Sequence, residues 1–185
     1  MENMCFSGVF LFYLCMKFLI VACLLFTIVT GFGQTPEIQP PYKRFPTPPP
    51  IKLLLGDSLT VYTKAQLPEH KPLLFMIFSP ECSHCQHETE EMVAHKDELK
   101  NVQIVMITFF PLWQMNEFIK NYKLNDLPNV IVGRDVYYTT PSFYNIHNLP
   151  FLAMYNANGN LIGVYEGTLP LEKLVKVFET NTPAN

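Results

Sequence analysis

The sequence predicts an α/β domain in which a mixed β-sheet carries helices on both faces. Three observations predict this class. Short apolar runs that suit buried strands alternate with stretches of helical periodicity. Two further apolar runs flank a polar turn, which indicates a β-hairpin. An amphipathic stretch follows the hairpin, and this order of segments is typical of a mixed sheet covered by helices.

The first half of the domain supplies three strands and two helices. Every residue from Pro72 to Phe78 is apolar, which predicts a strand buried on both faces. A helical pattern begins after Cys82, and a second buried strand is expected at 102–109. Pro111 can open another helix, which has an apolar stripe, and residues 129–132 form a third short strand.

The second half supplies the hairpin and the last helix. Residues 151–155 and 161–165 flank the segment Asn156-Ala157-Asn158-Gly159, whose residue types tolerate a positive φ. Pro170 can start a helix, because its fixed φ suits a first turn. Leu171, Leu174 and Phe178 then lie on one face of that helix.

The N-terminus has the features of an export signal. All residues from Phe18 to Val29 except Thr27 are apolar, and Lys17 precedes them. Small residues stand before Gln34, so we expect residues 1–33 to be a signal peptide that is cleaved there. Met16 has the features of the natural start of such a signal.

A retained membrane anchor is the alternative for residues 1–33, because an uncleaved apolar segment of this length can span a bilayer. Both alternatives place the rest of the chain outside the cytoplasm. We expect this part to be periplasmic. Residues 34–50 are rich in proline, which predicts an extended linker. Residues 51–185 are then the folded domain.

Charge and cysteine content limit the function classes. The net charge of -3 and the pI near 5.9 exclude a basic surface for nucleic acid. Three of the 5 cysteines lie in the N-terminal apolar stretch, so only Cys82 and Cys85 remain in the domain. A single pair is a poor structural disulfide framework but a complete redox centre.

The central motif is Cys82-Ser83-His84-Cys85, placed between a buried strand and a helix. Two cysteines at this spacing can close a disulfide with little backbone movement. The first thiol lies where free amide groups and the helix dipole stabilise a thiolate, which favours Cys82 as nucleophile and Cys85 as resolving thiol. His84 would favour the Cys82 thiolate, whereas the carboxylate of Glu81 would oppose it. Zinc is a weaker interpretation, because no second cysteine pair is present.

These residues carry a resemblance to a known family. The strand, the CxxC motif and the helix are followed by Tyr144-Asn145-Ile146-His147-Asn148-Leu149-Pro150 and by a hairpin that ends at Gly159. This order resembles the thioredoxin superfamily, and it is most similar to the exported TlpA/ResA-like branch. The resemblance covers about residues 53–180.

The resemblance implies a three-layer thioredoxin-like sandwich and a thiol-disulfide oxidoreductase. It implies that Pro150 is cis and packs beside Cys82, so that Leu149 and Pro150 border a substrate groove. The resemblance also implies that the protein's partners are thiol- or disulfide-bearing proteins outside the cytoplasm, together with a possible membrane electron donor. Glu81 replaces the family's tryptophan, and Ser83-His84 replaces its Gly-Pro. A histidine before the second cysteine is similar to the oxidising DsbA type, so the direction of electron flow stays open.

Two other functions stay open. Sco-type copper proteins share the fold, and Cys82, Cys85 and His147 together could form a soft copper site. In a non-catalytic binding module, the two cysteines would form a disulfide that only stabilises the start of the helix. No phosphate-binding glycine loop is present, so we expect no organic cofactor.

Overall fold

The computed structural model describes residues 12–21 and 39–181 of the 185-residue chain. The chain divides into two units after Ile38. In the first unit, residues 12–21 form a helix, in which Lys17 Nζ lies 4.7 Å from the ring centroid of Tyr13. The rest of the predicted signal peptide, including the cleavage point before Gln34, lies outside the described residues. None of the helices in these ranges combines the length and apolar character that a membrane span requires.

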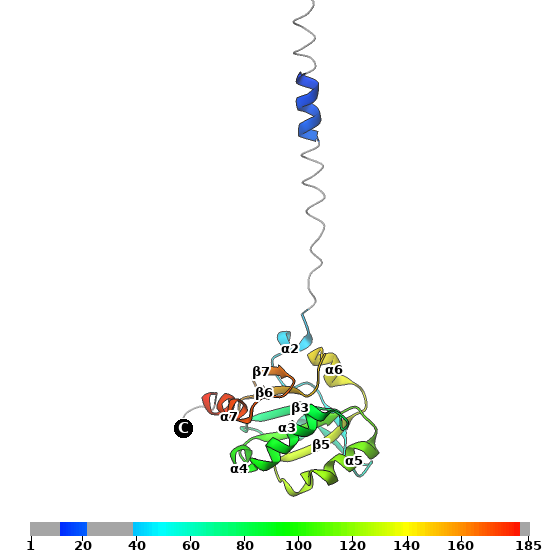
Figure 1. Cartoon of the computed structure of the whole chain (residues 1–185), viewed down its shortest axis with the longest axis vertical. Helices are drawn as coiled ribbons and strands as arrows, with labels where there is room; N and C mark the ends of the chain where they lie inside the picture. Colours follow the sequence, from blue (N-terminus) through cyan, green and yellow to red (C-terminus); the bar gives the residue numbers. More distant parts are fainter. Residues whose placement is uncertain (1–11, 22–38, 182–185) are drawn as a thin grey trace, which may run out of the picture. The chain divides into compact units, whose positions relative to one another are not determined.

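The second unit contains a seven-stranded sheet in the order β2-β1-β5-β4-β3-β6-β7 (Figure 1). Strands β3, β4 and β5 run parallel to one another. The remaining pairs, β1 with β2, β1 with β5, β3 with β6 and β6 with β7, are antiparallel, so the predicted mixed sheet is confirmed. The strands are β1 (Lys52–Leu54), β2 (Val61–Thr63), β3 (Leu73–Ile77), β4 (Gln103–Thr108), β5 (Val130–Asp135), β6 (Phe151–Tyr155) and β7 (Leu161–Glu166).

Helices cover both faces of this sheet, as the sequence predicts. Helices α3, α5 and α7 bury side chains in the core on one face, and α2 and α6 pack against the core on the other. The α-helices of this unit are α2 (Pro41–Arg44), α3 (Ser83–Ala94), α4 (Lys96–Leu99), α5 (Leu112–Asn121), α6 (Thr139–Tyr144) and α7 (Leu171–Thr180), and two 3-10 turns lie at Lys64–Gln66 and Leu124–Asp126.

Strand β3 separates the two cores. All five of its residues are buried. Leu74 and Met76 point into the core with α3, whereas Phe75 and Ile77 point into the core with α6. This confirms the prediction of a strand buried on both faces.

The register of the central strands determines where the site can form. Ile77, at the end of β3, pairs with Ile107 of β4 and with Phe151, the first residue of β6. Because β6 is antiparallel to β3, the residues before Phe151 return to the edge of the sheet where β3 ends. The predicted hairpin and last helix are present within one or two residues of their expected bounds.

The segment predicted as a linker belongs in part to the folded unit, which begins at Gln39 rather than at Ile51. Pro41 opens the short helix α2, as its fixed φ allows at a first helical position. The ring of Tyr42 lies 5.9 Å from that of Tyr144. Pro48 and Pro49 are buried, which proline tolerates because it brings no backbone N–H that would need a partner.

Candidate active site

Cys82 is the N-cap residue of α3, at the point where the chain leaves β3. The backbone N–H of Phe78 donates to the carbonyl of Ile107 and the N–H of Cys82 donates to the carbonyl of Ser79, at 2.9 and 3.2 Å. These bonds fix the turn. Cys82 Sγ accepts a hydrogen bond from the N–H of Cys85 at 3.3 Å. The sulfur therefore takes the place of the capping oxygen, where the free amide groups of a helix start are directed.

The two cysteines have different surroundings. Cys82 is half-buried, whereas Cys85 is fully buried in the core beneath α3. Burial raises the pKa of the Cys85 thiol, and its hydrogen bond with the Cys82 side chain raises it further. Both residues are free thiols in this structure. The two thiols therefore differ in their access to solvent.

The Leu149–Pro150 peptide bond is cis, which confirms the expectation drawn from the family resemblance. Pro150 is buried and Leu149 is half-buried. The thiol of Cys82 donates to the carbonyl oxygen of Leu149, with the sulfur 3.7 Å from that oxygen. The CxxC loop and the segment before β6 therefore meet at one edge of the sheet, although they are far apart in sequence.

Glu166, the last residue of β7, fixes the segment that leads to Pro150. Its carboxylate accepts hydrogen bonds from the backbone N–H groups of His147 and Asn148, at 3.4 and 3.0 Å. It also accepts a bond from the Asn148 side chain at 3.0 Å. Glu166 lies opposite Phe151 in the β6–β7 pair. The end of β7 therefore holds the segment that leads into β6. No local sequence pattern predicts this contact.

The other residues predicted to tune the pair are exposed. Ser83 is the first residue of α3. Glu81 accepts a hydrogen bond from the side-chain amide of Gln114 on α5 at 2.7 Å. No hydrogen bond in the described chain joins the ring of His84 to Cys82.

The copper alternative required His147 to join the two cysteines. The Nε2 atom of His147 instead lies 3.1 Å from the side-chain amide of Asn145. Within residues 12–21 and 39–181, no three His, Cys, Asp or Glu side chains are grouped so that they could hold a metal ion. The structure therefore does not bring Cys82, Cys85 and His147 together as a metal site, because Glu166 and Asn145 hold the His147 loop in place.

Glu88 is a buried acid of α3 that the sequence pattern does not single out. It lies three positions after Cys85 on α3 and is 3% exposed. Its Oε2 atom accepts a hydrogen bond from the N–H of Leu169 at 3.0 Å. Burial raises the pKa of this carboxyl from 4.5 to about 7. A carboxyl with such a pKa can exchange a proton near neutral pH.

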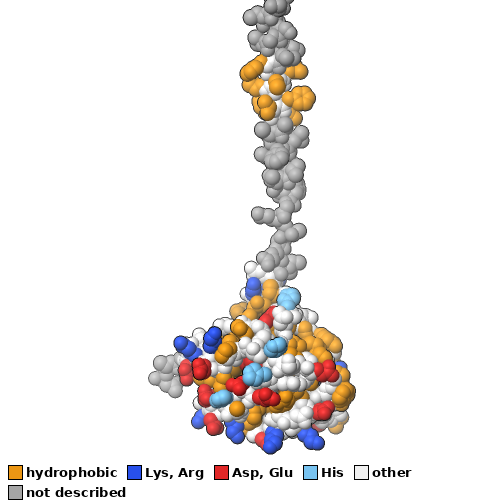
Figure 2. Space-filling view, in the orientation of Figure 1, with side chains coloured by type: hydrophobic (Ala, Val, Ile, Leu, Met, Phe, Trp, Pro, Cys, Tyr) orange, Lys and Arg blue, Asp and Glu red, His pale blue; other side chains and the backbone are white. Residues whose placement is uncertain are grey.

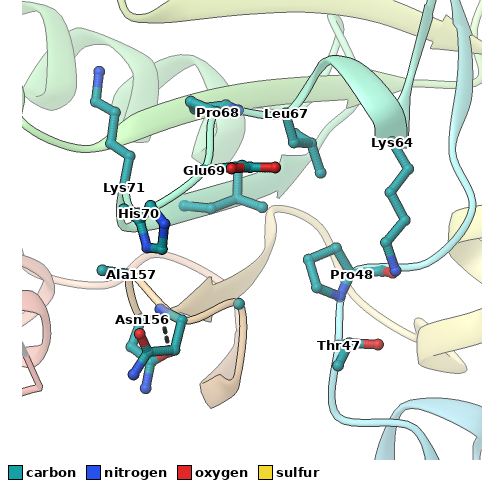
Figure 3. A pocket seen from close by; sticks show the side chains of 13 residues that line it. Thr47, Pro48, Lys64, Leu67, Pro68, Glu69, His70, Lys71, Asn156 and Ala157 are labelled. Carbon is teal, nitrogen blue, oxygen red and sulfur yellow. Dashed lines mark hydrogen bonds between the residues drawn. The ribbon is translucent and has the colours of Figure 1, made fainter.

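A separate hollow of about 460 Å³ lies at the other end of β3 (Figure 3). Its lining includes Leu73, the first residue of β3, and Asn156, which follows β6. Figure 3 shows Lys64 extending toward Pro48, whose carbonyl oxygen accepts a hydrogen bond from Nζ at 2.5 Å. No predicted site residue lines this hollow, so it is separate from the cysteine pair.

The family model of the thioredoxin-like domain matches residues 61–182. The chain belongs to the thioredoxin-like family. No curated protein has a sequence that matches it.

Solved structures share the thioredoxin-like fold. One is a secreted disulfide oxidoreductase of Mycobacterium tuberculosis homologous to E. coli DsbE, with 18% identity, a TM-score of 0.59 and coverage of 70% of this chain and 94% of that one. A thiol:disulfide interchange protein of Chlorobium tepidum has 17% identity, a TM-score of 0.61 and coverage of 78% and 98%. StoA of Bacillus subtilis has 16% identity, a TM-score of 0.52 and coverage of 71% and 98%.

In this thioredoxin-like domain the site combines three chemical elements. It has an accessible thiol at a helix start, a second thiol in the core behind it, and a backbone carbonyl beside the first sulfur. This arrangement can support attack on an external disulfide and a second attack from within the protein.

Proposed function

We propose that this protein is an extracytoplasmic thiol-disulfide oxidoreductase that exchanges disulfides with partner proteins through Cys82 and Cys85. The observation that carries the proposal is the position of Cys82 as the N-cap of α3, with Cys85 buried behind it and the Leu149 carbonyl beside it. An accessible thiol and a buried thiol at one helix start suit two successive attacks on one disulfide.

In the first step the Cys82 thiolate attacks one sulfur of a partner disulfide. A Cys82–partner disulfide forms, the partner's own S–S bond breaks, and the second partner sulfur leaves as a thiolate that takes up a proton. The N–H of Cys85, which already donates to Cys82 Sγ, stabilises negative charge on that sulfur before the attack.

In the second step Cys85 loses its proton and attacks Cys82 Sγ. The Cys82–Cys85 disulfide forms and the first partner sulfur leaves, so two electrons have passed from the protein to the partner. The raised pKa of Cys85 opposes this step, because the buried thiol must first be deprotonated.

We assign Glu88 as the acceptor of the Cys85 proton. The two side chains share one face of α3, since residues three apart are neighbours on a helix surface. Glu88 Oε2 is occupied by the N–H of Leu169, which leaves Oε1 to receive the proton. The pKa of about 7 allows the carboxylate to accept a proton near neutral pH and release it again.

Two observations support a location outside the cytoplasm. The apolar segment from Phe18 to Val29 has the composition of an export signal or membrane anchor. The Mycobacterium tuberculosis protein that shares the fold is described as secreted. The partners would be thiol- or disulfide-bearing proteins of that compartment, and a membrane electron donor could return electrons to the pair.

Equilibration with glutathione tests the proposal. The domain is incubated in buffers with different ratios of reduced to oxidised glutathione, and the Cys82–Cys85 disulfide is quantified by thiol alkylation and mass spectrometry. We expect reversible interconversion at a defined potential, together with reduction of the disulfides of insulin. A disulfide that resists reduction, in a protein that leaves insulin unchanged, would support the non-catalytic binding module instead.

A further inference from the structure

A hollow of about 250 Å³ lies beside the cysteine loop, between the start of α3 and helix α5. Pro80 and Glu81, which directly precede Cys82, form one of its walls, and α5 forms the other. Its lining includes Glu81, Trp113, Gln114 and Glu117. The hollow therefore lies next to the chain segment that carries the reactive thiol.

The charge of the hollow is uncompensated. Glu81 and Glu117 are both exposed, and no Lys, Arg or His side chain is among the lining residues. Neither carboxylate forms an ion pair within the described part of the chain, where the hydrogen bond to Glu81 comes from the neutral amide of Gln114. Figure 2 shows acidic side chains among those exposed along α3 and α5. The hollow therefore favours a cation.

An exposed aromatic side chain in the lining also suits a cation. The Trp113 side chain is 65% exposed, and the face of an indole ring attracts ammonium and guanidinium groups.

We propose that this hollow is a subsite for an arginine or lysine side chain of the partner polypeptide, next to the partner cysteine that is joined to Cys82. The proposal rests on the proposed function and specifies its substrate class. Each residue of an extended chain spans about 3.3 Å, so a basic side chain one or two positions from the partner cysteine can reach the hollow. An apolar side chain fits less well, because it would cover Glu81 and Glu117 without neutralising them.

Matched peptide substrates test the subsite. Each peptide carries one cysteine in a mixed disulfide with glutathione, and either arginine or its neutral isostere citrulline in the position before or after the cysteine. The reduced protein converts each substrate to a peptide thiol and glutathione, and itself acquires the Cys82–Cys85 disulfide. The readout is the second-order rate constant for this single reaction of the reduced protein, given as the ratio of the arginine peptide to the citrulline peptide, at low and at high salt.

At low salt we expect the arginine peptide to react about five- to tenfold faster at the better of the two positions, because a cation–π contact and an exposed ion pair each contribute modestly. The ratio should fall toward one at high salt and in the variants Glu117→Gln and Trp113→Ala. The control variant Glu179→Gln removes an exposed carboxylate of α7 that does not line the hollow, and it should keep the ratio.

A ratio near one in the wild-type protein, with both peptides reduced at normal rates, would overturn the subsite and leave the proposed function intact. A high ratio that persists in both Glu117→Gln and Trp113→Ala would also overturn it, because the preference would then arise elsewhere. If neither peptide is reduced, the proposed function itself is contradicted.

Discussion

The sulfur of Cys82 lies 3.7 Å from the carbonyl oxygen of Leu149, a residue 67 positions later in the chain. The pairing of β3 with β6 makes this contact possible, since Ile77 and Phe151 are partners at the same sheet edge. The contact places a fixed hydrogen-bond acceptor beside the reactive thiol.

The first prediction concerns Glu166, which holds the segment before Pro150 through three hydrogen bonds. Glu166→Ala should lower the second-order rate constant with which the reduced protein reduces a peptide–glutathione disulfide by about fivefold, and should lower the free energy of unfolding by about 1 kcal/mol. Glu166→Gln keeps one oxygen acceptor and should restore part of both losses. An unchanged rate constant in the alanine variant, with the stability loss present, would show that the contact serves the fold alone.

The second prediction concerns stability and the ionisation of Glu88. The pKa of this carboxyl rises from 4.5 to about 7 on folding, so the folded state binds the proton more tightly than the unfolded state. The stability that this proton supplies is fully present below about pH 4.5 and is lost as the pH rises through about 7. The loss amounts to about 3 kcal/mol in the free energy of unfolding.

Glu88→Gln should remove this pH dependence, because glutamine stays neutral and its side-chain oxygen can still accept the N–H of Leu169. Urea unfolding of both proteins at pH 4 and pH 8 measures the effect. From pH 4 to pH 8, the free energy of unfolding of the wild type should fall by about 3 kcal/mol relative to that of the variant. Parallel stability curves for the two proteins would contradict the assigned burial of an ionisable Glu88.

The third prediction concerns the role of Glu88 in the resolving step. A preformed mixed disulfide at Cys82 should release its peptide thiol faster as the pH rises through about 7, where the carboxylate forms. Glu88→Gln should slow this release by about 10²-fold at pH 7, since a positioned base typically contributes at least that much. Single-turnover release of the peptide thiol measures the rate, and identical pH profiles would exclude Glu88 as the base.

The fourth prediction concerns the N-terminus of the exported protein. If residues 1–33 are a cleaved signal, N-terminal sequencing of the protein recovered outside the cytoplasm should begin at Gln34. A protein that still carries the segment from Phe18 to Val29, and that sediments with membranes, would indicate the anchor instead.

Much of the fold could be predicted because its central strands are continuous apolar runs. Buried strands such as β3 leave this signal in any sequence, and the CxxC motif marks the boundary between β3 and α3. The short strands β1 and β2 were not predicted, since three residues are too few for a periodic pattern. Helix α6 was missed as well, because it is short and contains Pro141.

The contacts that complete the site depend on tertiary structure. Glu88 follows His87 and precedes two further residues with polar side chains, so nothing in the local sequence marks it as buried. Its burial follows from the packing of the segment at Leu169 against α3. Glu166 reaches His147 and Asn148 only because β7 pairs with β6. Sequence reasoning therefore found the thiols and the proline but missed the acids that support them.

The unequal roles of the two cysteines are the central claim, and trapping of mixed disulfides tests it most directly. Cys85→Ser and Cys82→Ser variants, together with the wild type, are expressed with their export signal, and adducts are identified by nonreducing electrophoresis and mass spectrometry. Cys85→Ser should accumulate disulfides between Cys82 and partner proteins, because the resolving thiol is absent. Cys82→Ser should form none, since Cys85 is buried. Equal trapping by the two variants, or no adduct in either, would contradict the account.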